Sequence, residues 1–180
     1  GVAPWRLLQP VLGFPIVTFA INFVYNLWLI IVFCILYWQL FQLSKPELRL
    51  RFLYSFVLCW IVLGSIMAVP LAAAGPCFYG DIVPGGQAYQ ELMTYLQRAD
   101  QHHPVWALDI QERLFAYYKK GEIGYGSGIS AMPSLHVSIA FLIALLARYY
   151  RRWVRYAAYI FLVFIMIGSV HLAWHYAIDG

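Results

Sequence analysis

Two long stretches of the sequence contain no charged residue, and they constrain the fold more than any other feature. They cover residues 14–41 and 52–78 and are rich in Phe, Leu, Ile and Val. A helix needs about 20 apolar residues to cross the hydrocarbon core of a bilayer, so each stretch is long enough. Of all residues, 63% are hydrophobic and only 11% are charged, which is too apolar for an ordinary soluble domain. The chain is therefore expected to be an integral membrane protein.

Two shorter apolar stretches extend this pattern. Residues 134–147 form a run that is short for a complete crossing, and residues 156–176 form a longer one. We therefore predict an all-α fold: a polytopic membrane helix bundle with at least four transmembrane helices, in a single domain that covers residues 1–180. The sequence does not begin with Met and stops directly after a His/Asp pair, so we expect this domain to be truncated at both ends.

Lys and Arg are unevenly distributed between the predicted spans. The linkers 42–51 and 148–155 contain seven of them and one acid, whereas residues 75–133 contain four together with six acids. Loops rich in Lys and Arg stay in the cytoplasm. The sequence therefore predicts that residues 75–133 lie on the extracytoplasmic side. The net charge of +4 is explained by this anchoring, and no nucleic-acid partner is expected.

The long outer segment is expected to contain two short helices. Residues 87–99 and 105–118 have helical spacing of apolar positions, and Pro and Gly residues separate them from their neighbours. Short helices that lie at the membrane interface fit this pattern. Two interpretations stay open for them, a solvated cap with no further role and a lid over a substrate entrance.

Histidines stand at the outer ends of the last two predicted spans. His136 begins one of them, and His171, His175 and Asp179 follow one another at intervals of four residues near the end of the other. On a helix this spacing places all three side chains on one face. In a hairpin that turns near Arg152, His136 and this face lie on the same side of the membrane. Ionisable side chains at membrane depth are costly and usually serve a function.

A loop rich in Gly and Ser precedes His136. It covers residues 124–130, and its backbone N–H groups are suited to binding an anion. Ser134 is well placed to cap the helix that follows, whose N-terminus attracts phosphate. Ser127, Gly128 and Ser134 are therefore candidate substrate-binding residues.

Two short motifs around the histidines carry a family resemblance. Pro-Ser-Leu-His at residues 133–136 and His-Tyr-Ala-Ile-Asp at residues 175–179 resemble the second and third signature motifs of the type 2 phosphatidic acid phosphatase superfamily. The contexts GSGISAMPSLH and WHYAID are most similar to the branch that contains inositol phosphorylceramide synthases and related bacterial lipid phosphotransferases or phosphatases. The motifs cover residues 124–180, and the earlier spans match only in hydropathy.

The resemblance implies phosphoryl transfer without a metal or another cofactor, through a phosphohistidine. His175 would attack phosphorus, Asp179 would hold its ring in the right tautomer, and His136 would protonate the departing oxygen. Water or a lipid alcohol would then take the group from His175. The implied substrate is a phospholipid or a lipid phosphate, and the enzyme would be a phosphoric ester hydrolase or a phosphotransferase.

The sequence departs from the superfamily pattern in two places. The third motif usually has an Arg six residues before the nucleophile, where this chain has Ser169, and the first motif, a Lys with an Arg-Pro pair seven residues on, is absent. Other groups must then meet the charge of the phosphate. The candidates are Arg113, Lys119 and Lys120, just ahead of the glycine loop, and His171.

Two other functions remain open from the residues alone. A transporter or channel could use His171, His175 and Asp179 as a proton relay or as a metal site. A purely structural membrane subunit would explain the spans, although it would not explain the histidines. Neither alternative predicts the Pro-Ser-Leu-His context of His136, which favours the enzyme.

Overall fold

The computed structural model describes residues 3–121 and 130–179. Within these residues the chain is all-helical and contains no strand. One isolated antiparallel bridge joins Ala74 to Ser130. The predicted all-α class is therefore confirmed.

In the described part of the chain, three helices are long and apolar enough to cross a membrane. They are α2 (Pro15–Leu40), the continuous helix Pro46–Met67, and α8 (Arg152–His171). The second consists of α3 (Pro46–Leu58) and a π-helical continuation, η1 (Cys59–Met67). Proline occupies the first turn of α2 and of α3, where its fixed φ suits a helix and its missing N–H costs no hydrogen bond.

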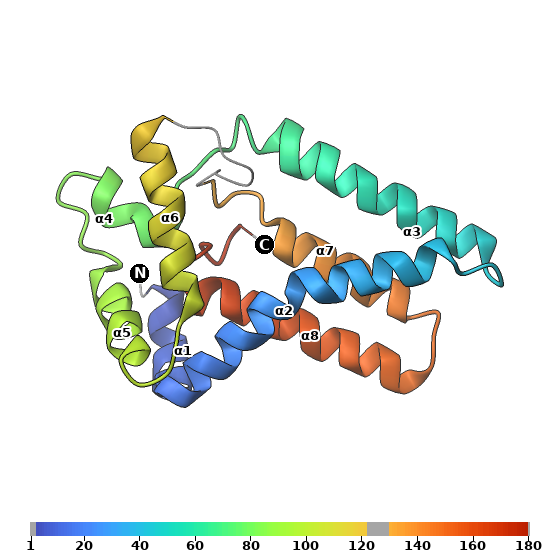
Figure 1. Ribbon diagram of the computed structural model, residues 1–180, viewed down its shortest axis with the longest axis horizontal. Coiled ribbons are helices and arrows are strands. Elements are labelled where there is room, and N and C mark those ends of the chain that lie inside the picture. Colours follow the sequence, from blue (N-terminus) through green and yellow to red (C-terminus); the bar gives the residue numbers. More distant parts are fainter. Residues whose placement is uncertain (1–2, 122–129, 180) are drawn as a thin grey trace.

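The fourth apolar helix, α7 (Leu135–Ala147), is shorter. It has 13 residues, or about 20 Å of helix at 1.5 Å per residue, against a hydrocarbon core of about 30 Å. A complete crossing by α7 therefore stays a prediction. Figure 1 shows α7 alongside α8, and these two helices pack against each other.

Two predicted spans have different bounds in the structure. The span expected at 52–78 begins at Pro46 and ends at Met67, because Pro70 cannot continue a helix. The span expected at 156–176 begins at Arg152 and ends at His171.

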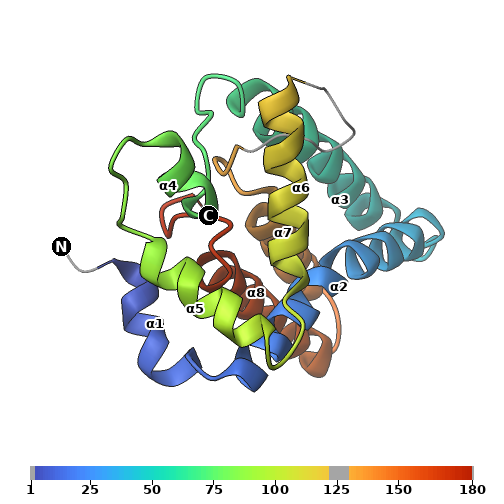
Figure 2. The same ribbon diagram turned by 60° about the vertical axis from the view of Figure 1, so that its left-hand side comes forward.

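The outer segment folds into short helices at one end of the bundle. Figures 1 and 2 show α4 (Tyr79–Ile82), α5 (Gln90–Asp100) and α6 (Trp106–Lys120) together there, and Figure 1 shows the α2–α3 and α7–α8 turns at the opposite end. The helices expected at 87–99 and 105–118 are thus found as α5 and α6. Their position at a membrane interface stays a prediction. The N-terminal α1 (Pro4–Leu12) joins α5 through an ion pair of 2.8 Å between Arg6 and Glu91.

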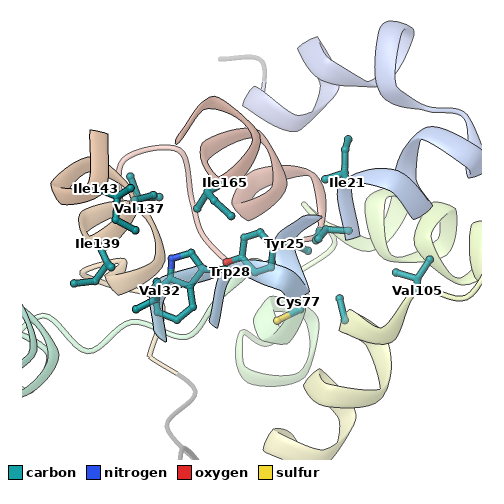
Figure 3. Packing of buried hydrophobic residues seen from close by; sticks show 14 of the residues in the cluster. Ile21, Tyr25, Trp28, Val32, Cys77, Val105, Val137, Ile139, Ile143 and Ile165 are labelled. Carbon is teal, nitrogen blue, oxygen red and sulfur yellow. The ribbon is translucent and has the colours of Figure 1, made fainter. Parts of the chain in front are cut away.

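The centre of the bundle is formed by α2, α7 and α8. Figure 3 shows Tyr25, Trp28 and Val32 of α2 beside the side chains of α7 and Ile165 of α8. A Cβ atom added at Gly168 of α8 would lie 2.8 Å from Tyr25 Cδ2, so this glycine lets α2 approach α8 closely. Because lipid tails are as apolar as these side chains, tight packing is what stabilises the contact in a membrane.

Candidate active site

A cavity of about 610 Å³ lies near the outer helices, and both His136 and His175 line it. Most of its wall is apolar or aromatic. Residues of α2, η1 and α6 contribute to that wall, as do the segment before α7 and the segment after α8. A cavity of this size and lining is typical of a small-molecule or lipid site.

His136 is placed by the start of α7 and by two aromatic side chains of α2. Ser134 caps α7, because its Oγ accepts a hydrogen bond from the Val137 N–H at 3.4 Å. Tyr25 stacks on the imidazole with ring centroids 4.9 Å apart, and the Trp28 ring is 4.3 Å away. Trp28 Nε1 also donates to the His136 carbonyl at 3.0 Å. The ring is therefore held on the cavity wall by packing from a neighbouring helix.

The segment that carries His175 is not helical. The expectation that His171, His175 and Asp179 lie on one face of a helix is therefore wrong. Helix α8 ends at His171, and Ala173 adopts a left-handed conformation with φ of 60°. The N–H groups of Trp174 and His175 both donate to the Ser169 carbonyl, at 3.0 and 2.9 Å. The chain turns sharply there, so the four-residue spacing no longer aligns the side chains.

His175 is fixed by a backbone carbonyl. Its Nδ1 lies 2.5 Å from the Ala131 carbonyl oxygen, and since a carbonyl can only accept, Nδ1 carries the proton. The unprotonated nitrogen of the neutral ring is then Nε2. Burial lowers the pKa of His175, although the Ala131 carbonyl and Asp179 oppose this effect. His175 is therefore neutral near pH 7, with Nε2 as its nucleophilic atom.

Asp179 stabilises the His175 loop rather than bonding to the ring. Its Oδ2 accepts a hydrogen bond from the Tyr176 N–H at 2.8 Å and lies 3.9 Å from His175 Nδ1. Burial raises the pKa of Asp179, while the Tyr176 N–H and His175 lower it. The Asp179 carbonyl accepts from the Ser134 N–H at 2.9 Å, which joins this loop to the residue that caps α7.

The two histidines from distant parts of the sequence meet in the cavity. Their ring centroids are 6.2 Å apart, so a single phosphoryl group bound between them can contact both. This juxtaposition was expected from the helical hairpin.

His171 lies outside the cavity wall. Its side chain is fully buried, and its Nε2 is 2.9 Å from Thr18 Oγ1, which lies 2.6 Å from the Tyr95 hydroxyl. The structure therefore places His171 in a polar contact between α8, α2 and α5. It does not bring this residue together with His136 and His175.

The predicted phosphate-binding cations are also absent from the cavity wall. Helix α6 turns Ile110 and Leu114 toward the cavity, and Arg113, Lys119 and Lys120 are exposed elsewhere on this helix. Lys119 Nζ lies 4.4 Å from the centroid of the Phe115 ring. Within the described residues, the cavity wall contains no Lys or Arg. Ser127 and Gly128 lie outside the described residues.

Several parts of the site were not foreseen from the sequence. The Ala131 carbonyl has no sequence signal, because every residue has a backbone carbonyl. Tyr25 and Trp28 are spaced for one helical face, but the sequence contains 14 Tyr and 7 Trp, so the pair does not stand out. Asn26 of α2 also lines the cavity.

The metal-site alternative finds no support in this geometry. In residues 3–121 and 130–179, no three His, Cys, Asp or Glu side chains are grouped as metal ligands. His171, which that alternative requires beside His175, contacts Thr18 instead.

Comparison with known proteins gives one match. The family model of the PAP2 superfamily matches residues 2–180. No curated protein and no solved structure matches the chain. The family match spans the helices, the cavity and both histidine motifs. The chain therefore belongs to the PAP2 superfamily.

Proposed function

We propose that this protein is a membrane-embedded lipid phosphatase or phosphotransferase that works through a phosphohistidine on His175. Membership of the PAP2 superfamily supports a function of the phosphatase or phosphotransferase type in general. The observation that carries the mechanism is the His175 Nδ1 contact with the Ala131 carbonyl, because it leaves Nε2 as the nucleophile in a cavity that also contains His136.

In the first step, His175 Nε2 attacks the phosphorus atom of the substrate. A P–N bond forms, the P–O bond to the leaving group breaks, and His136 gives its proton to the departing oxygen. The His175 ring gains positive charge in this step. The Ala131 carbonyl at Nδ1 and the nearby Asp179 carboxylate stabilise that charge.

In the second step, water or an alcohol attacks the phosphohistidine. The P–N bond breaks, His175 returns to its neutral form, and His136 accepts the proton of the attacking hydroxyl. His136 thus serves as the general acid in the first step and as the general base in the second.

The substrate we propose is a phospholipid or a lipid phosphate. Support comes from the apolar wall of the cavity and from the three helices that can cross a membrane. The inositol phosphorylceramide synthase-like motif contexts favour the branch that transfers a phosphoryl or phosphodiester group between lipids. Ser127 and Gly128 remain sequence-based candidates for contacts to the phosphate.

We also propose that the site opens on the extracytoplasmic side. The basic turns between α2 and α3 and between α7 and α8 lie at the end of the bundle away from α4, α5 and α6. The positive-inside rule assigns those turns to the cytoplasm.

A substrate panel tests this function. The purified full-length protein is incubated with labelled phosphatidate, phosphoinositide or polyprenyl diphosphate, with and without ceramide or diacylglycerol. At least one donor should yield a hydrolysis product, either free phosphate or a headgroup phosphate, or a transfer product, and His175→Ala should yield none of them. Absence of turnover with every donor, or turnover that survives His175→Ala, would reject the proposal.

A further inference from the structure

We infer that Asn26 is a binding residue for the acceptor, and that this acceptor is a neutral lipid with a free hydroxyl group. The inference rests on the proposed two-step function and adds a contact for its second step. It identifies the class of molecule that takes the phosphoryl group from His175.

The orientation of the Asn26 amide is determined by a backbone carbonyl. Asn26 lines the cavity that contains His136 and His175. Its Nδ2 donates to the Asn22 carbonyl at 2.7 Å, and it lies 3.2 Å from Asn22 Oδ1. Since a backbone carbonyl can only accept, the nitrogen must face Asn22. The Oδ1 atom therefore points away from Asn22, and no hydrogen bond between described residues uses it.

Asn22 is itself held in place, so the pair has little freedom to rotate. Its side chain is fully buried. Its Oδ1 accepts from the Ala107 N–H at 3.3 Å in the first turn of α6, and its Nδ2 is 3.5 Å from the Pro104 carbonyl. The amide of Asn26 is thus supported by a second asparagine that is fixed by α6.

The charge and polarity of Asn26 Oδ1 select its ligand. An amide oxygen accepts hydrogen bonds and cannot donate them, so it repels the oxygens of a phosphate and suits an O–H group. Asn26 cannot replace the missing phosphate-binding arginine, because its only donor group is engaged by Asn22. A neutral hydroxyl donor is therefore the ligand that this atom favours.

The position of Asn26 suits an attacking alcohol. It lines the same cavity as His136, the group that would accept the hydroxyl proton, and as His175. Beyond it, Leu29 of α2 and Trp60 and Gly64 of η1 line the cavity. These apolar residues suit the hydrocarbon chain of the acceptor.

The second step can then be written with the acceptor in place. The acceptor O–H donates to Asn26 Oδ1 while the acceptor binds. The O–H bond then turns from Asn26 Oδ1 to His136, the acceptor oxygen attacks phosphorus, the P–Nε2 bond to His175 breaks, and the proton moves to His136. Water can attack the same intermediate, so loss of the Asn26 contact should shift the products from transfer toward hydrolysis.

The test compares the two half-reactions in the full-length protein. The donor is whichever labelled lipid turns over in the substrate panel, and the acceptors are ceramide, diacylglycerol and a long-chain alcohol. Asn26→Leu should form phosphohistidine at the wild-type rate. Its KM for the acceptor should rise about tenfold, as expected for loss of one hydrogen bond of about 1.4 kcal/mol, and more of the hydrolysis product should appear.

Ser65→Ala provides the matched control. Ser65 lies on η1, bonds within its own helix to the Trp60 carbonyl, and does not line the cavity. This variant should leave both half-reactions unchanged. Formation of phosphohistidine by Asn26→Leu also shows that the variant is folded.

Three outcomes would overturn the inference. The first is a phosphohistidine in the wild type that no tested acceptor can discharge faster than water. The second is an Asn26→Leu variant with the same acceptor KM as Ser65→Ala. The third is a loss of phosphohistidine formation in Asn26→Leu, which would assign Asn26 to the donor or to the fold. Absence of phosphohistidine in the wild type is a different result, because it rejects the proposed function itself.

Discussion

His136 and His175 are oriented by different kinds of contact, and this difference suits their different roles. His136 is packed against the rings of Tyr25 and Trp28, whereas His175 is hydrogen bonded through Nδ1 to the Ala131 carbonyl. Aromatic packing orients the His136 ring without fixing one tautomer, so the ring can still gain and lose a proton. A carbonyl at Nδ1 fixes the tautomer that a nucleophile requires.

The role of His136 as an acid predicts a dependence on the leaving group. General-acid catalysis contributes about 10²- to 10⁴-fold, so His136→Ala should lose that much activity on a lipid substrate. On a nitrophenyl phosphate ester the loss should be small, because nitrophenolate leaves without a proton. The measurement is kcat/KM for both substrates. Equal losses on the two would indicate that His136 binds phosphate instead.

The neutral state of His175 predicts the acid side of the pH profile. Burial lowers the pKa of this ring below its ordinary value of 6.5, so protonation, which removes the nucleophile, occurs only in more acidic solution. Activity on the nitrophenyl ester should therefore persist as the pH falls through 6.5 and decline below it. A decline centred at or above pH 6.5 would contradict a His175 pKa that burial has lowered.

At the scale of the elements, the turn after α8 determines the site. Residues 172–179 contain no Gly or Pro, so nothing in the sequence marks the end of the helix at His171. Ala173 adopts a left-handed conformation, which costs roughly 1–2 kcal/mol for a residue with a Cβ atom. Its carbonyl accepts from the Cys77 N–H at 3.0 Å, so a contact from a distant part of the chain helps to hold this turn.

The segment before Cys77 also approaches the turn after α8 closely, at Gly75. A Cβ atom at this position would lie 2.6 Å from the Trp174 carbonyl oxygen, next to His175. Gly75→Ala should therefore displace the His175 turn, and a displacement of about 1 Å can lower a rate by about 10²-fold.

Gly80→Ala is the control for this effect. A Cβ atom there would have one heavy atom within 4 Å, the Gly86 carbonyl oxygen at 3.3 Å, and would not meet the His175 turn. Gly75→Ala should form phosphohistidine about 10²-fold more slowly than Gly80→Ala. Equal rates would show that the approach of Gly75 to Trp174 is not needed for the site.

The sequence predicted the elements better than it predicted the site. Helix α2 and the outer helices α5 and α6 follow from runs of apolar residues and from their spacing, which depend only on local sequence. His136 and His175 could be paired because a helical hairpin brings their ends together. The Ala131 contact, the exclusion of Arg113, Lys119 and Lys120 from the described cavity wall, and the separation of His171 from His175 depend on side-chain directions and on the turn at Ala173, which local patterns do not encode.

At the scale of the whole molecule, the histidine end and the basic end of the bundle are opposite. If the basic turns are cytoplasmic, Gln97 of α5 and Arg152 of α8 lie on opposite sides of the membrane. Cysteines introduced at these two exposed positions, in a background that lacks Cys34, Cys59 and Cys77, should react with an impermeant reagent from opposite sides of sealed vesicles. Labelling of both from the same side would contradict the proposed topology.

The covalent intermediate tests the account most directly. The wild type, mixed with its labelled lipid donor and quenched at alkaline pH to preserve phosphohistidine, should carry the phosphoryl group on His175 alone when the site is located by mass spectrometry. His136→Ala should carry the same modification with the nitrophenyl ester, and His175→Ala should carry none. A turnover-competent wild type without a phosphohistidine, or a label that remains in His175→Ala, would contradict the central role assigned to His175.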